Sequence, residues 1–224
     1  MKIGVFSDIH SNNYALNEIF KAEKDINKWL CAGDFCGLFP NVNETINSLI
    51  ENDVIMVLGN HENSLINSTV KIENSYTANE AIKVQREAIS KKNMEFLLQL
   101  KPFIDLEINE KKIHITHELQ PELGKYTFNF KALTKYFKYD IIIFGHTHLP
   151  LVQYLNNSIV INPGSLGFPV DLKRKGSYMI LDLEKMEVKI KHINYSKTSL
   201  INDIKKNNYN HKLIKYISNN HEWI

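Results

Sequence analysis

Five short polar clusters in the sequence contain side chains of the kinds that bind metal ions in hydrolytic sites. Each follows an apolar, strand-like stretch, and they are Asp8-Ile9-His10, Gly33-Asp34, Gly59-Asn60-His61-Glu62, Thr116-His117 and Gly145-His146-Thr147-His148. Imidazole, carboxylate and amide donors suit manganese, iron or zinc. Cysteine is missing from the clusters, which argues against a structural zinc site of the cysteine type.

Most of these clusters have a simpler explanation when taken alone. Gly33-Asp34 could be an ordinary turn, Asn60-His61 could cap a helix, and His117 could be a buried histidine with a hydrogen-bond partner. His146 and His148 give the strongest single signal, because histidines at positions i and i+2 after an apolar strand rarely serve packing. Taken together and in this order, the clusters favour a metal site.

The segments that carry the clusters alternate between strand and helix patterns. In the first half, strands are expected at 2–6, 28–32 and 54–58, and helices at 13–24 and 43–52. Strands that alternate with helices favour an α/β layered core. Because ligand sites in such sheets form outside the carboxyl ends of the strands, we expect the clusters to meet at one edge.

The second half of the chain has a different character. A long helix is expected at 79–100, ended by Pro102. Further elements are expected in chain order as strands at 103–108 and 111–116, a helix near 129–138, and strands at 141–144, 151–155, 158–161, 177–183 and 188–193. The tail has apolar residues at helical spacing. We therefore expect one domain over residues 1–224, with 196–224 as a helical C-terminal extension packed on it.

Composition narrows the function classes. Lys and Arg total 27 against 25 for Asp and Glu, a formal charge of +2, which gives no support for dedicated nucleic-acid or membrane-surface binding. Arg86 and Arg174 are the only arginines, too few for an arginine-lined phosphate site. No signal peptide or apolar span of 18 residues is present. Cys31 and Cys36 make no disulfide framework, so we expect a cytoplasmic protein.

The ordered clusters resemble the calcineurin-like metallophosphoesterase superfamily. The later Asn162-Pro163-Gly164-Ser165 run is similar to that of its small, single-domain phosphodiesterase branch in bacteria and archaea, and the resemblance extends from Met1 to about Tyr195. It implies an α/β fold in four αββα layers, with two mixed β-sheets flanked by helices.

The resemblance also implies two divalent metal ions and a role for each cluster. Asp8, His10 and His148 would hold the first ion, Asn60, His117 and His146 would hold the second, and Asp34 would bridge them. Such ions, ~3.5–4 Å apart, would share a hydroxide that attacks phosphorus in line. His61 would lie just outside them as an acid or charge stabiliser. Manganese is the expected metal, with iron, zinc and nickel as alternatives. The implied activity is a phosphodiesterase that hydrolyses small, soluble, nucleotide-like esters.

Three departures from the family pattern bear on the substrate. Glu118 stands where a glycine commonly follows the histidine, and its carboxylate could repel an anionic substrate or bind a ligand water. Val170 replaces a frequent arginine, unless Lys173, Arg174 or Lys175 supplies that charge. Phe35-Cys36-Gly37 replaces the Asp-Arg-Gly run of protein phosphatases, which disfavours phosphoprotein substrates.

Two other functions remain as alternatives. Relatives that act as non-catalytic, metal-binding interaction scaffolds lose residues such as His61, and this chain keeps them. A nuclease would carry an added DNA-binding domain or a basic stripe, and neither is evident. The sequence does not fix the substrate, the native metal or the oligomeric state, a homo-oligomer included.

Overall fold

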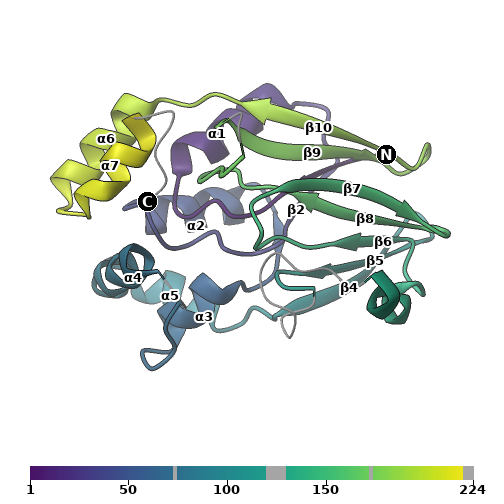
Figure 1. The fold of residues 1–224 in the computed structure, drawn as a ribbon, viewed down its shortest axis with the longest axis horizontal. Helices are drawn as coiled ribbons and strands as arrows, with labels where there is room; N and C mark the ends of the chain where they lie inside the picture. The colour runs from purple at the N-terminus through teal and green to yellow at the C-terminus, as the bar shows by residue number, and fades with distance from the viewer. Residues whose placement is uncertain (73–74, 120–129, 172–173, 219–224) are drawn as a thin grey trace.

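Two mixed five-stranded β-sheets form the centre of the protein (Figure 1). The computed structural model describes residues 1–72, 75–119, 130–171 and 174–218. The first sheet has the order β10-β9-β1-β2-β3 and consists of β1 (Lys2–Phe6), β2 (Lys28–Cys31), β3 (Ile55–Met56), β9 (Gly176–Asp182) and β10 (Glu187–Ile193). The second has the order β4-β5-β6-β8-β7 and consists of β4 (Phe103–Ile108), β5 (Lys111–Thr116), β6 (Ile141–Ile143), β7 (Pro150–Leu155) and β8 (Ser158–Pro163).

Parallel pairing brings several strand ends to one edge of each sheet. In the first sheet β1, β2 and β3 run parallel, and in the second β5, β6 and β8 do. The other strands pair antiparallel, with β9 and β10 on one side of β1, β4 beside β5 and β7 beside β8. The loops that follow β1, β2, β3, β5 and β6 carry the five polar clusters.

Helices cover the outer faces of both sheets. They are α1 (Asn13–Ala22), α2 (Val42–Glu51), α3 (Asn60–Ile66), α4 (Tyr76–Ala88), α5 (Lys91–Leu97), the 3₁₀ helix η2 (Phe130–Tyr136), α6 (Lys197–Lys206) and α7 (His211–Ser218). The 3₁₀ helix packs over the second sheet through Leu133, which lies against Ile142 and Val160. None of the helices in the described part of the chain is long and apolar enough to cross a membrane.

Side-chain alternation along the strands produces two separate apolar cores. On β1, Ile3 and Val5 face the second sheet, whereas Phe6 packs with Trp29 beneath the helices α1 and α2. This period of two follows from the pleat of a strand. The sheet-to-sheet core is completed by aliphatic residues of β5, β6 and β8. The predicted α/β fold with two mixed sheets flanked by helices is confirmed.

Two predicted helices differ from the structure, and one further helix was not predicted. The single helix expected at 79–100 is divided, because Ser90 caps the start of α5 with its side chain and its own N–H is held by Asn43 Oδ1 at 2.9 Å. The helix expected near 129–138 is 3₁₀ and not α over its described residues. The short helix α3, which begins at Asn60, was not predicted as a helix of its own.

The C-terminal helices α6 and α7 pack against the body through a third apolar cluster. Figure 1 shows them at the helical end of the molecule, opposite the N-terminus. The cluster joins Leu200, Ile204 and Leu213 of the extension to Phe39 and Ala81 of the body. The part of the predicted extension at 219–224 lies outside the described residues.

Candidate metal centre

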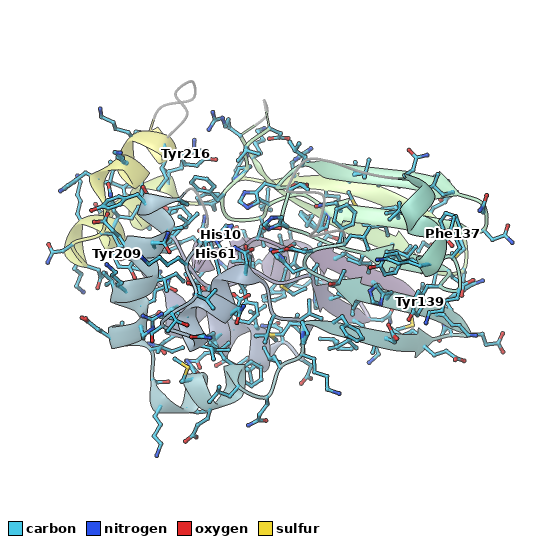
Figure 2. The ribbon with its side chains drawn as sticks, turned by 60° about the horizontal axis from the view of Figure 1, so that its bottom comes forward. His10, His61, Phe137, Tyr139, Tyr209 and Tyr216 are labelled. Carbon is cyan, nitrogen blue, oxygen red and sulfur yellow. The ribbon has the colours of Figure 1, made fainter. Side chains whose placement is uncertain are left out.

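The structure brings the predicted ligands of all five loops together where the two sheets end. Three overlapping groups of side chains place their ligand atoms within 4.8 Å of one another, and these groups are Asp8-His10-His148, His10-Asp34-His61 and Asp34-His117-His146. Asp34 belongs to two of the groups and so lies between the other residues. Figure 2 shows His10 and His61 side by side at the centre of the molecule.

The first group is almost completely buried and has three donor atoms that face one another. His148 Nε2 lies 3.1 Å from His10 Nε2 and 3.1 Å from Asp8 Oδ1. All three side chains are buried, and Asp8 Oδ1 makes no hydrogen bond in the described structure. A buried carboxylate oxygen needs a partner, because taking it out of water is costly. A cation held between these atoms would supply one.

The group Asp34-His117-His146 is here called the second group, and the amide of Asn60 lies against it. Asp34 and His117 are buried, whereas His146 and Asn60 are half-buried. Asn60 Oδ1 lies 3.1 Å from His117 Nε2 and 3.1 Å from His146 Nδ1. His117 Nε2 also lies 3.1 Å from Asp34 Oδ2. Asn60 and not His61 therefore points at the two histidines, and its role as a ligand stays a prediction.

Backbone carbonyls orient three of the histidines for metal binding. The Nδ1 atoms of His10, His117 and His148 lie 3.3, 2.7 and 2.9 Å from the carbonyl oxygens of Cys36, Ala32 and Phe168. A carbonyl only accepts, so each Nδ1 carries a proton, and Nε2 is the ring atom left to bind a cation. Partners of this kind fix the tautomer of metal-binding histidines. The donor set therefore fits divalent cations.

The loops that carry the ligands hold several of them in an unfavourable backbone conformation. Five of the seven predicted ligands have positive φ values between 51° and 68°, and they are Asp8, His10, Asp34, His146 and His148. Non-glycine residues rarely adopt this region, and such strain clusters at functional sites. The loop after β6 approaches the loop after β1 so closely that Gly145 must be a glycine. A Cβ at this position would lie 2.1 Å from Ser7 Oγ.

The electrostatics of the cluster favour positive charge. Burial alone would raise the pKa of Asp34, but His117 and His61 outweigh it and hold the pKa well below its usual range. Burial would likewise raise the pKa of Asp8, but the nearby His148 outweighs burial and lowers the pKa of Asp8. Burial would lower the pKa of His117, yet the Asp34 carboxylate raises it to about 10. Two buried carboxylates thus attract cations, either protons or metal ions.

His61 is more deeply buried than we expected for a residue predicted to lie just outside the metal ions. The residue is 6% exposed, and its ring centre lies 4.5 Å from that of His10. Burial lowers the pKa of His61 to about 4, so the ring is neutral near pH 7. Its Nε2 lies 3.8 Å from Asp34 Oδ2, and its backbone N–H donates to Asp34 Oδ1 at 2.9 Å.

Glu62 is a functional residue to which the sequence reasoning gave no role. Its buried carboxylate accepts backbone N–H groups from Asp34 at 2.9 Å, Cys36 at 2.6 Å and Gly59 at 2.7 Å. Burial raises its pKa to about 7. Glu62 therefore ties the Asp34 loop to the start of α3. The glutamate three positions after a helix N-cap is the signal that could have identified it.

The Asn162-Pro163-Gly164-Ser165 run forms hydrogen bonds with two of the ligand loops. Asn162 Nδ2 donates to Gly145 O at 2.7 Å and Thr147 Oγ1 at 3.0 Å, which holds the loop of His146 and His148. Ser165 Oγ donates to the carbonyl of Asp8 at 2.7 Å. The motif thus positions two ligand loops.

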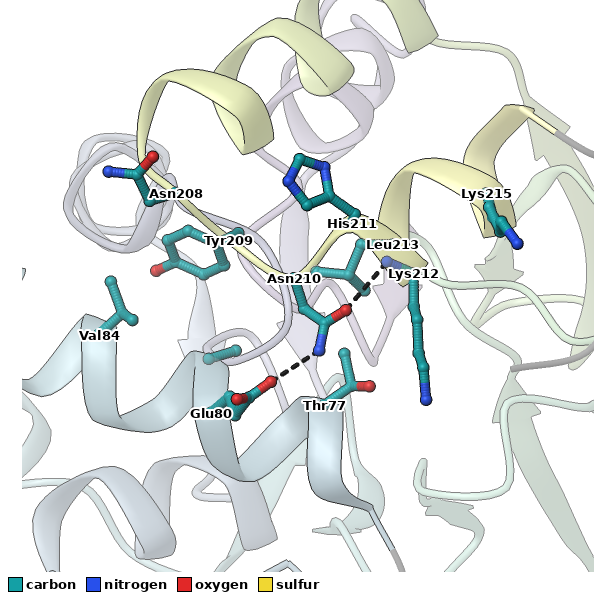
Figure 3. Close-up of a pocket in the computed structure, with 11 residues that line it drawn as sticks. Thr77, Glu80, Val84, Asn208, Tyr209, Asn210, His211, Lys212, Leu213 and Lys215 are labelled. Atoms are coloured by element: carbon teal, nitrogen blue, oxygen red, sulfur yellow. Dashed lines mark hydrogen bonds between the residues drawn. The ribbon is translucent and has the colours of Figure 1, made fainter.

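Several other residues are not among the predicted ligands. His114, which faces the opposite side of β5 from the site, pairs with Asp105 at 2.7 Å. Cys31 and Cys36 are buried free thiols, and burial raises both pKa values well above the ordinary one. A separate hollow of about 480 Å³ lies between α4 and the α6–α7 connection, where Asn210 bonds Glu80 (Figure 3).

The two-sheet α/β fold with histidine and carboxylate loops at the strand ends is the arrangement that the resemblance to metallophosphoesterases implies. A family model described as the calcineurin-like phosphoesterase superfamily domain matches residues 1–186. The chain belongs to this superfamily, which confirms the predicted resemblance.

Individual relatives agree with this assignment. An uncharacterised protein of Methanocaldococcus jannaschii is 32% identical over 226 residues, which cover 92% of each chain. A protein named phosphodiesterase from the same organism is 29% identical and covers 84% of this chain and 96% of its own. The crystal structure of a metallophosphoesterase from Sphaerobacter thermophilus shares the fold, with a TM-score of 0.81 at 19% identity over 99% of this chain and 100% of that one.

Proposed function

We propose that this protein is a two-metal phosphodiesterase that hydrolyses small, soluble, nucleotide-like phosphate esters. The observation that carries the proposal is the position of Asp34 between two groups of ligands, because one carboxylate has two oxygens to offer. Seven ligands are too many for one tetrahedral ion. The relative named phosphodiesterase supports the reaction type.

The proposed ligand assignment follows the contacts within the cluster. The first ion would be held by Asp8, His10 and His148, and the second by Asn60, His117 and His146, with Asp34 shared by both. Four imidazoles among these ligands favour manganese, with iron, zinc or nickel as alternatives, over magnesium, which prefers oxygen donors.

When bound, such a metal pair supplies a water nucleophile that is acidic enough to act near neutral pH and neutralises charge on the phosphoryl oxygens. The chain itself supplies orientation and exclusion of water through its buried ligand loops. His61 is a neutral imidazole beside Asp34, and its N–H would donate a hydrogen bond to the departing oxygen as negative charge develops there.

Glu118 supports a preference for diesters over monoesters. Its carboxylate lies 3.8 Å from His146 Nδ1 at the partly exposed side of the second group. A phosphodiester carries one negative charge at pH 7, whereas a monoester carries ~1.5 to 2. An added carboxylate beside the site therefore repels a monoester more strongly than a diester.

A cytoplasmic location stays a prediction.

The experiment that tests the proposal is a matrix of metals and substrates on chelator-stripped protein. We expect manganese to restore hydrolysis of bis(p-nitrophenyl) phosphate at a higher kcat/KM than that of p-nitrophenyl phosphate or a phosphopeptide. Activity on the monoester alone would contradict the diesterase assignment. Metal binding without turnover of any ester would instead support the scaffold alternative.

A further inference from the structure

An aromatic pair connects the C-terminal helix α7 to the loop beside the first group of ligands. Tyr216 stacks on Phe168, with ring centres 3.9 Å apart and an interplanar angle of 21°. The Tyr216 hydroxyl donates to the carbonyl of Pro169, and the Arg174 guanidinium lies 5.1 Å from the centre of the tyrosine ring. Tyr216 is 7% exposed. It lies beyond residues 1–186, the part matched by the family model.

Phe168 in turn touches two predicted ligands of the first ion. Its carbonyl accepts the Nδ1–H of His148 at 2.9 Å, the bond that fixes the tautomer of that ring. Its side chain meets His10 and His148 edge to face, with ring centres 6.2 and 6.0 Å apart. The Phe168 N–H is held by Ser165 Oγ at 2.8 Å. Phe168 therefore contacts the ligands with its backbone and its side chain.

The extension that carries Tyr216 is fastened to the body at independent points. Asp203 of α6 accepts hydrogen bonds from the Tyr14 hydroxyl at 2.7 Å and from Asn41 Nδ2 at 2.9 Å. Asn210 donates to Glu80 at 2.6 Å. These contacts are made by α6 and by the connection before α7, so the extension is attached to the body at points other than the aromatic pair.

We propose that Tyr216 is a positioning residue of the metal centre, which holds Phe168 so that its carbonyl keeps the His148 ring oriented with Nε2 facing the first ion. The inference rests on the proposed function for its link to metal binding. Its structural part, the orientation of the His148 ring, is independent of whether the protein turns over any substrate. The C-terminal extension would thus complete a site whose ligands all lie before residue 149.

The orientation of the His148 ring in crystals of metal-free protein is the direct test. We expect wild-type His148 Nδ1 to lie within hydrogen-bond distance of the Phe168 carbonyl oxygen, as it does here at 2.9 Å. Tyr216→Leu should displace the Phe168 carbonyl and break this contact, whereas Tyr216→Phe, which keeps the stack, should match the wild type. If Tyr216→Leu does not fold, Tyr216→Met serves in its place. An unchanged contact in the folded leucine or methionine variant would overturn the proposal.

Tyr209→Leu is the matched control. Tyr209 is also a buried tyrosine of the extension, 4% exposed, but it lines the hollow in Figure 3 and lies apart from Tyr216 in Figure 2. We expect this variant to leave the orientation of the His148 ring as in the wild type. An equal change in both variants would mean general loosening of the extension and would also overturn the proposal.

Manganese titration against a competing chelator provides the second readout. We expect Tyr216→Leu to weaken the first of two sites about 10- to 100-fold, the usual effect of losing an outer partner of a ligand, and to leave the other site unchanged. Equal weakening of both sites would contradict a specific role for Tyr216. Wild-type protein that binds no metal would refute the proposed function, and the crystal structures of the metal-free variants would still decide the structural part.

Discussion

Replacing His61 with alanine should leave both metal ions bound and remove most of the turnover. His61 contributes its backbone N–H to Asp34 Oδ1 at 2.9 Å, and alanine retains that bond. The amide of Asn60, not the His61 ring, lies 3.1 Å from the two histidines of the second group. Under the proposed ligand assignment, the substitution therefore removes an imidazole beside the ligands without removing a ligand.

The size of the loss follows from the state of the imidazole. With a pKa of about 4, roughly one His61 ring in a thousand is protonated at pH 7, so the neutral N–H is the group that acts. Nearby divalent ions would lower that fraction further, because like charges disfavour the imidazolium. Removing one preorganised donor to a developing negative charge costs about 10²–10³ in kcat, or about 2.7–4 kcal/mol.

The assay compares kcat for bis(p-nitrophenyl) phosphate and for a dialkyl phosphate, together with metal content by elemental analysis. We expect the larger loss with the dialkyl ester, because an alkoxide needs more stabilisation than an aryl oxide. His114→Ala is the control, since His114 is a buried histidine that pairs with Asp105 outside the site. Loss of metal in His61→Ala would show that His61 is a ligand, and unchanged turnover would refute its catalytic role.

Three further outcomes are expected. Manganese should restore more activity than magnesium after chelation, because four of the ligands are imidazoles; equal rates across the substrate panel would count against the ligand assignment. Glu118→Gln should raise kcat/KM for a monoester about tenfold relative to a diester by removing one negative charge near the second group; an unchanged ratio in steady-state assays would contradict the charge argument. Glu62→Ala should lower the free energy of unfolding by about 3–5 kcal/mol in urea titrations, because the substitution leaves three buried N–H groups of the ligand loops without their carboxylate. A loss below about 1 kcal/mol would mean that water replaces the carboxylate.

The ligand loops were predictable because strand pattern and strand direction carry most of the information. The apolar runs at 2–6 and 111–116 form β1 and β5 with the predicted bounds. Within each sheet, parallel strands deliver their carboxyl ends to one edge, which is where Asp8 of the first sheet and His117 of the second lie. The packing of the two sheets, which brings these edges together, was implied by the family resemblance and not by the spacing of residues.

Other features depend on tertiary contacts that periodicity does not encode. The burial of His61 results from its packing against His10, a residue 51 positions earlier in the chain. The division between α4 and α5 depends on a bond from Asn43 to Ser90. The stack of Tyr216 on Phe168 joins segments that no spacing rule relates. Each of these contacts becomes visible only when the chain is folded.

The number and position of the metal ions test the central claim most directly. Crystals of manganese-loaded protein, measured on both sides of the manganese absorption edge, should show two anomalous peaks per chain ~3.5–4 Å apart with the Asp34 carboxylate between them. Asp34→Asn should lose at least one of the two peaks. A single peak per chain in the wild type, with metal binding by Asp34→Asn unchanged, would contradict the two-metal account.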